Sequence, residues 1–150
     1  MIEGTAASDA SFADQRMVMH VRECAEQEIR IPFHVGDDRS RTWIITRLEG
    51  GRFRLKHDHR HADGREDEIT QYGGDTAMVS ASETQAFQAD ALTARLIPQA
   101  ASNVWTVAVE PGKTFSYALR REAESRRFRV DFDLSRPVAP PPAPWGAATR

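Results

Sequence analysis

The stretch that decides the fold is residues 103–134, NVWTVAVEPGKTFSYALRREAESRRFRVDFDL. Apolar and polar side chains alternate in three segments of it, separated by Pro111-Gly112-Lys113 and by the polar run 121–126. Successive side chains of a β-strand point to opposite faces, so each segment has one apolar face. Three such strands joined by short turns predict an antiparallel meander with one buried and one wet face. The apolar faces comprise Trp105, Val107, Val109, Phe115, Tyr117, Leu119, Phe128, Val130, Phe132 and Leu134.

Similar alternation continues upstream of this meander. Pro32 within the first of these strands favours a sheet edge, because proline cannot donate to the ladder. Asp90 predicts the N-cap of a short helix that Pro98 ends. The expected strands are 29–35, 42–49, 52–61, 66–72, a weaker 77–81 after a break at Gly73-Gly74-Asp75, and 86–89, with the helix at 91–97.

Residues 12–27 change the period. Met17, Val21 and Cys24 recur at helical spacings, with charged side chains between them. Apolar residues three and four apart share one face of a helix, so this segment predicts a single amphipathic N-terminal helix. Ser11 or Asp14 could cap its start.

Together these elements predict a mainly β fold, α+β at the margin. Eight or nine short antiparallel strands favour a β-barrel or strongly rolled sheet, with the helix plugging one end or covering a seam. A two-sheet sandwich is the alternative. We expect a flexible N-terminus over 1–11, one β-rich domain over 12–135 and an extended Pro-rich tail over 136–150. Trp145 in that tail could dock on the β-rich domain or on a partner, such as the second chain of a homodimer.

Composition narrows the class of protein. The chain of 150 residues is 40% apolar and 28% charged, with a net charge of −2, as in soluble globular domains. No basic excess points to nucleic acid or membrane surfaces. The single Cys24 excludes an internal disulfide. Arginine far outnumbers lysine, a bias typical of GC-rich bacterial genomes. No signal peptide is evident, which favours the cytoplasm, or export if a leader has been removed.

The segment RFRLKHDHRH, residues 52–61, carries the main functional signal. Phe53 and Leu55 share a strand face with three imidazoles, His57, His59 and His61. The opposite face, Arg52 to Arg60 at even positions, is all charged and is expected to contact water. The odd face therefore begins as core and continues as a candidate binding site.

Asp63-Gly64 suits two hairpin turns. With a two-residue turn, His61 faces Glu66, His59 faces Glu68 and His57 faces Thr70, which makes a polar pocket mouth. With a three-residue turn, His61 faces Asp67, His59 faces Ile69 and His57 faces Gln71. The sequence does not choose between these registers.

Three interpretations of the histidines follow. They could bind a divalent transition metal, since imidazole is a common ligand, with His57, His59, His61 and Glu68 as the candidate set. His57 and His59 could instead bind a small ligand in a barrel cavity, together with Tyr72, Trp105 and Tyr117. They could also be solvated groups at the end of a protruding hairpin. The candidate ligand-binding residues are His57, His59, Tyr72, Trp105 and Tyr117.

Three functions are therefore open. A small-molecule binding module using the His57 to Tyr72 hairpin leads. A hydrolase- or lyase-type enzyme would use a histidine or a metal at the same site as acid, base or water activator. An interaction protein would use the Pro-rich tail. Trp43 and Trp105 are expected to be core anchors, and His20 and His34 surface residues.

Overall fold

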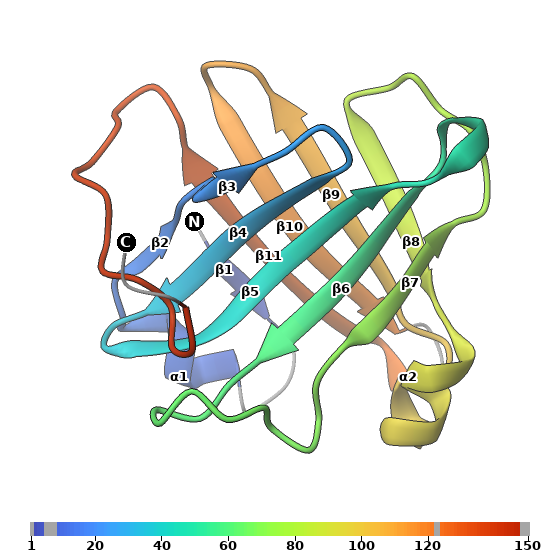
Figure 1. The fold of residues 1–150 in the computed structure, drawn as a ribbon, viewed down its shortest axis with the longest axis horizontal. Coiled ribbons are helices and arrows are strands. Elements are labelled where there is room, and N and C mark those ends of the chain that lie inside the picture. Colours follow the sequence, from blue (N-terminus) through green and yellow to red (C-terminus); the bar gives the residue numbers. More distant parts are fainter. Residues whose placement is uncertain (1, 5–8, 122–123, 148–150) are drawn as a thin grey trace.

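The computed structural model describes residues 2–4, 9–121 and 124–147 (Figure 1). These residues form one antiparallel sheet of eleven strands that curls into a half-barrel, which confirms the mainly β, rolled-sheet prediction with more strands than expected. The strands are β1 (Ile2–Gly4), β2 (Met17–Met19), β3 (Glu23–Cys24), β4 (Glu28–Val35), β5 (Asp38–Arg47), β6 (Phe53–His59), β7 (Tyr72–Thr76), β8 (Thr84–Ala89), β9 (Val104–Glu110), β10 (Thr114–Arg121) and β11 (Arg126–Asp133).

Helices are short. They are α1 (Ala10–Ala13) and α2 (Ala91–Leu96), with the 3₁₀ turns η2 (Glu49–Gly51) and η3 (Pro98–Ala100). The predicted N-cap of α2 is confirmed, since the Asp90 carboxylate accepts a hydrogen bond from the Thr93 amide at 2.9 Å. In the described ranges, no helix has the length and apolar character needed to cross a membrane.

The order of strands leaves the barrel open. From β4 to β11 each strand pairs with its successor in the chain. β1 pairs with β11 at one end of this series, and β2 and β3 pair with β4 at the other. The sheet therefore curls without joining its two ends, β1 and β2, and a seam remains between β2 and the part of β11 that extends past β1.

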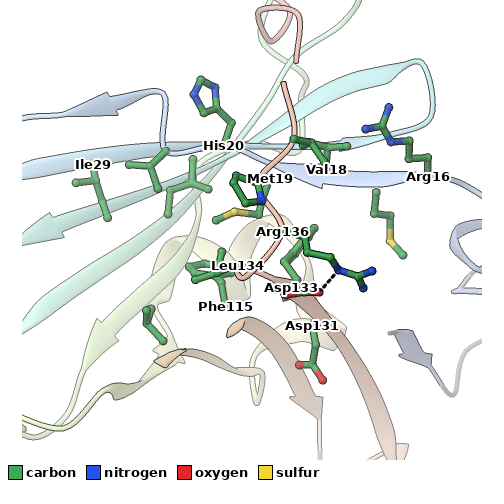
Figure 2. Close-up of a pocket in the computed structure, with 17 residues that line it drawn as sticks. Arg16, Val18, Met19, His20, Ile29, Phe115, Asp131, Asp133, Leu134 and Arg136 are labelled. Atoms are coloured by element: carbon green, nitrogen blue, oxygen red, sulfur yellow. Dashed lines mark hydrogen bonds and ion pairs between the residues drawn. The ribbon is translucent and has the colours of Figure 1, made fainter. Parts of the chain in front are cut away.

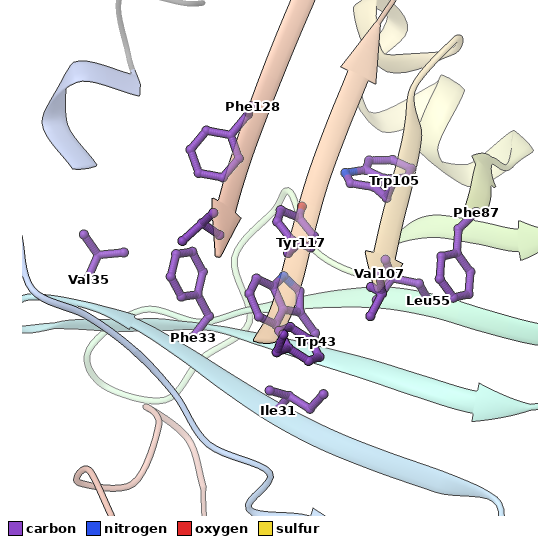
Figure 3. Close-up of a cluster of buried hydrophobic side chains, with 12 residues drawn as sticks. Ile31, Phe33, Val35, Trp43, Leu55, Phe87, Trp105, Val107, Tyr117 and Phe128 are labelled. Atoms are coloured by element: carbon purple, nitrogen blue, oxygen red, sulfur yellow. The ribbon is translucent and has the colours of Figure 1, made fainter. Parts of the chain in front are cut away.

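Aromatic side chains from both sides of the curled sheet fill its interior (Figure 3). The Trp43 ring stacks on Tyr117 and Phe33, with ring centroids 4.5 and 4.8 Å apart. Trp43 and Trp105 are each 2% exposed, so their prediction as core anchors is confirmed. Alternation in the predicted meander places Trp105 and Tyr117 inside, because the same face of β9, β10 and β11 points to the core.

The predicted helix over 12–27 is wrong. α1 spans a single turn, and β2 and β3 occupy most of the segment, paired with β4. Short apolar runs fit helix and strand periods alike, and here the unpaired edge of β4 decides. Pro32 explains why two short strands replace one long strand. Its carbonyl accepts from the His20 amide, so its missing N–H faces the gap between β2 and β3.

The predicted hairpin at Asp63-Gly64 is also wrong in register. β6 pairs with β7 through His57 and Tyr72, not through either predicted alignment. Between them the chain forms a loop with one isolated bridge, Arg60 to Glu66.

Gly73 and Gly74 belong to β7 rather than breaking it, and no strand forms at 77–81. Glycine is needed there because a Cβ would overlap the carbonyls of Leu55 and Gln88.

The N-terminal segment is partly ordered into the sheet. Within the segment expected to be flexible, β1 pairs with β11, and residues 1 and 5–8 lie outside the described residues. The Asp9 carboxylate, which is buried, forms two hydrogen bonds with the Arg126 guanidinium at 2.5 and 2.8 Å. This ion pair fastens α1 to β11.

We call residues 135–147 the strap, because this segment lies across the outer face of the sheet. The Trp145 amide donates to the Arg39 carbonyl at 3.0 Å, and the Arg39 guanidinium donates to the Ala143 carbonyl at 2.9 Å.

Two predictions about the outer face of the sheet are wrong. His34 is 4% exposed and Asp58 is 8% exposed, so neither is a surface residue. Sequence periodicity identifies the outer face but not what covers it.

Candidate functional site

His57 and His59 lie on β6 and His61 follows it, and the three histidines have three different environments. His57 is buried, His59 is half-buried, and His61 is exposed beyond the end of the strand. The barrel interior ends along this strand, so each successive imidazole lies closer to solvent. The histidines therefore do not converge on a common point.

His57 has both ring nitrogens engaged. Its Nδ1 lies 2.9 Å from the Tyr72 carbonyl, and its Nε2 lies 2.8 Å from the Tyr117 hydroxyl. A carbonyl only accepts, so Nδ1 carries the proton and Nε2 accepts from Tyr117. Burial lowers the pKa of His57 to about 4, against the smaller opposing effect of its bond to Tyr72. The imidazole is therefore neutral at pH 7.

Three of the other predicted ligand-binding residues surround His57. Tyr72 stacks on the imidazole with centroids 4.5 Å apart, and Trp105 lies at 5.1 Å. Burial raises the pKa of Tyr72 and raises that of Tyr117 further, so both phenols stay protonated. The structure brings these four side chains together. They contact one another, however, and form a satisfied polar cluster within the core.

His59 belongs to a second, more exposed group. Its Nδ1 lies 3.1 Å from an Asp67 carboxylate oxygen, and His61 Nε2 lies 4.0 Å from the same oxygen. The Ile69 amide donates to the other oxygen and, as the largest cause, lowers the pKa of Asp67. An imidazole pair bridged by one carboxylate is a common surface arrangement.

The predicted metal set is not assembled. Glu68 lies exposed on the loop after the Arg60–Glu66 bridge, and both His57 nitrogens are occupied. Across the part of the chain that the structure describes, no group of three histidine, cysteine, aspartate or glutamate residues could hold a metal ion. The structure therefore does not bring the predicted metal ligands of this hairpin together.

A larger site, which sequence reasoning missed, lies at the open seam (Figure 2). We call it the seam groove. Its volume is about 760 Å³, and β2, β4, β9, β10, β11 and the strap contribute to its walls. Most of its 17 lining residues are apolar. These are Met17, Val18, Met19, Val21, Ile29, Ile31, Val109, Phe115, Phe132, Leu134, Pro137 and Val138.

The apolar lining of the groove follows from strand periodicity. Met17 and Met19 pair with Val35 and Phe33 of β4, so their side chains face the interior. Phe115, on β10, is 5% exposed and closes the deep end of the groove. Ordinarily the next strand of a closed barrel would cover these side chains. At the seam there is no such strand among the described residues.

Charged groups stand at the rim of the groove. Asp133 accepts from Ser135 and lies 3.0 Å from the Arg136 guanidinium, and these bonds, Ser135 first, lower the pKa of Asp133 to about 2. Arg16 is exposed and forms no ion pair with any described residue. The rim therefore offers one unpaired cation beside an apolar cavity.

One signal in the sequence could have indicated this groove. Met17 and Met19 alternate with Arg16 and Val18 at the strand period, and Phe132 and Leu134 continue an apolar face to the end of the meander. The periodicity of these edge residues does not reveal that they face each other.

Comparison of the chain with protein-family models, curated proteins and solved structures finds no match.

Proposed function

We propose that this protein is a binding module that holds a small, mainly apolar molecule in the seam groove. The observation that carries the proposal is a cavity of about 760 Å³ with an apolar lining, open on one side of an incomplete barrel. Small-molecule sites are usually concave and apolar, with volumes of about 300–1,000 Å³ and a few polar groups. The groove has this size and composition.

The partial exposure of the apolar side chains that line the groove favours a bound apolar molecule. Ile31 and Phe115 at the floor are almost fully buried, whereas Met17, Met19 and Leu134 at the walls are only half-buried. An apolar molecule in the groove would remove these half-exposed side chains from water, and apolar burial is favourable by about 25 cal/mol per Å². Methionine adapts its shape to varied apolar ligands.

The charged rim fits a ligand with one polar end. Arg16 and the Arg136–Asp133 pair lie at the mouth, away from the apolar floor. Such a division favours an amphipathic molecule whose chain enters the groove and whose polar end stays at the rim. This proposal moves the ligand site from the predicted hairpin to the seam while keeping the predicted class of function.

Displacement of a neutral fluorescent probe, N-phenyl-1-naphthylamine, by 1-decanol tests the proposal. Wild-type protein should bind the probe saturably at one site. Met19→Arg and Leu134→Arg place a charge in the groove and should each weaken binding at least tenfold. Val79→Arg alters an exposed apolar residue that does not line the groove and should leave binding unchanged.

Two results would refute the site. One is no saturable binding by the wild type. The other is equal binding by the wild type, Met19→Arg and Leu134→Arg, which would place the probe elsewhere. Measuring mass in solution alongside the titration separates a ligand groove from an interface, because a second chain seated there would make a dimer that Leu134→Arg breaks.

A further inference from the structure

β4 and β5 pair irregularly beneath the strap. Phe33 pairs with Arg41, but Val35 pairs with Asp38, so two residues of β5, Arg39 and Ser40, lie opposite the single residue His34. This is a β-bulge, which bends a strand and redirects its side chains. Bulges occur often beside binding sites.

One buried polar atom at this bulge has no partner. His34 is 4% exposed, and its Nε2 makes no hydrogen bond with any described residue. Leaving buried donors or acceptors unpaired costs free energy, so such atoms indicate a missing partner. The bulge therefore has hydrogen-bonding capacity that the described chain does not use.

His34 also lines a cavity of about 860 Å³ between the sheet and residues 139–142 of the strap. We call it the strap cavity. Arg16 and Arg39 also line this cavity, and neither forms an ion pair with a described residue. The one carboxylate in its lining, Asp37, is exposed at the β4–β5 turn. Positive charge is therefore in excess around His34.

We propose that the strap cavity binds the phosphate or carboxylate group of a small molecule through Arg16, Arg39 and His34. Guanidinium groups present paired donors that match both oxyanions. The imidazole supplies a further donor from the ring nitrogen that now lacks a partner. This site is separate from the floor of the seam groove, although Arg16 and Val18 line both cavities.

The charges around His34 agree with an absent anion. Burial, then the nearby Arg39, lowers the pKa of His34. An anion beside the imidazole would oppose both effects and favour its protonated form. Binding should therefore be coupled to proton uptake and be tighter at lower pH. The charged or titratable groups facing His34 are Arg39, Asp38, His20 and Arg22, with Arg16 and Asp37 in the cavity lining.

Calorimetric titration with inorganic phosphate and with acetate tests the proposal and identifies which oxyanion is preferred. Arg39→Gln should weaken binding of the preferred anion at least tenfold. Arg47→Gln removes an exposed arginine at the other end of the same strand and should leave it unchanged. Sulfate, whose charge is constant from pH 6 to 8, should bind several-fold more tightly at pH 6.

The proton resonances of His34 give a readout that requires no variant. Saturating sulfate should raise the pKa at which these resonances titrate, while those of exposed His61 shift little. Equal anion effects in wild type, Arg39→Gln and Arg47→Gln, or an unchanged His34 titration, would overturn the proposal and leave ordered water as the partner of the bulge. Retained N-phenyl-1-naphthylamine binding by Arg39→Gln would show that the seam groove is independent.

Discussion

His57 shows how one side chain can have a pattern typical of a binding site and a structural role. Its position on the inner face of β6 was predicted correctly from alternation. Its role depends on partners 15 and 60 residues away, the Tyr72 carbonyl and the Tyr117 hydroxyl. A buried imidazole with both nitrogens hydrogen-bonded stabilises a core, whereas one with a free nitrogen can act on a ligand.

The neutral state of His57 makes stability depend on pH. Its pKa is about 4 when folded and near 6.5 when unfolded, so the unfolded chain binds more protons between these values. Stability is therefore complete above pH 6.5 and falls as the pH drops toward 4. From pH 7.5 to 4.5 we expect a loss of roughly 2–3 kcal/mol, measured by urea unfolding.

The matched control for this prediction is His61, which is exposed. His57→Gln should be less stable at pH 7.5, because it disrupts the polar cluster, and its stability should vary less with pH. His61→Gln should keep the full pH dependence. The assignment fails if the two variants and the wild type lose the same stability on acidification.

Among the elements, the strap shows how a segment without regular structure can cover a sheet. A proline-rich segment cannot join a sheet, and its extended form was predicted. Its docking on its own chain was one of two options for Trp145. Pro144 and Trp145 line a cavity of about 330 Å³ with Pro32, Thr42 and Asp58 on the outer face. The strap thus covers part of the sheet that alternation predicted to be wet.

Trp145 is expected to hold the strap in place. Trp145→Ala removes a half-buried ring next to the main-chain hydrogen bond from the residue-145 amide to the Arg39 carbonyl, and should lower the hydrogen-exchange protection of that amide several-fold. Val138→Ala changes a strap residue that is 56% exposed and should not alter this protection. Equal protection of the residue-145 amide in all three proteins would show that the ring does not anchor this segment.

At the scale of the whole molecule, the core ties the two arms of the curled sheet together. Trp43 of β5 stacks on Phe33 of β4, and also on Tyr117 and Phe115 of β10 (Figure 3). β5 and β10 are not neighbours in the sheet. These ring contacts therefore maintain the curl that forms both the interior and the seam groove.

Trp43→Ala should therefore be among the most destabilising single changes. Truncating a buried tryptophan typically costs about 3–5 kcal/mol through lost burial and the cavity left behind. Trp43→Phe keeps a stacked ring and should cost less than half as much. Urea unfolding with far-ultraviolet circular dichroism measures both. A cost below about 1 kcal/mol for Trp43→Ala would contradict this role for the ring stack.

Residues whose environment is set by local pattern were predictable. β9 to β11, the cap at Asp90 and the burial of Trp43 and Trp105 all follow from alternation, turn residues or side-chain size, which operate over a few residues. These features determined the fold class and the inner faces of β4, β6 and β9 to β11.

Tertiary structure decided the rest. Residues 17–19 and 23–24 are strands because β4 offers an unpaired edge, and His57 pairs with Tyr72 because the loop between them is longer than a tight turn. The seam groove joins residues between 16 and 31 to residues between 109 and 138, and the strap cavity joins residues between 16 and 39 to residues 139–142. Contacts at that separation depend on how the whole sheet curls, and periodicity, which is a local property, does not encode them.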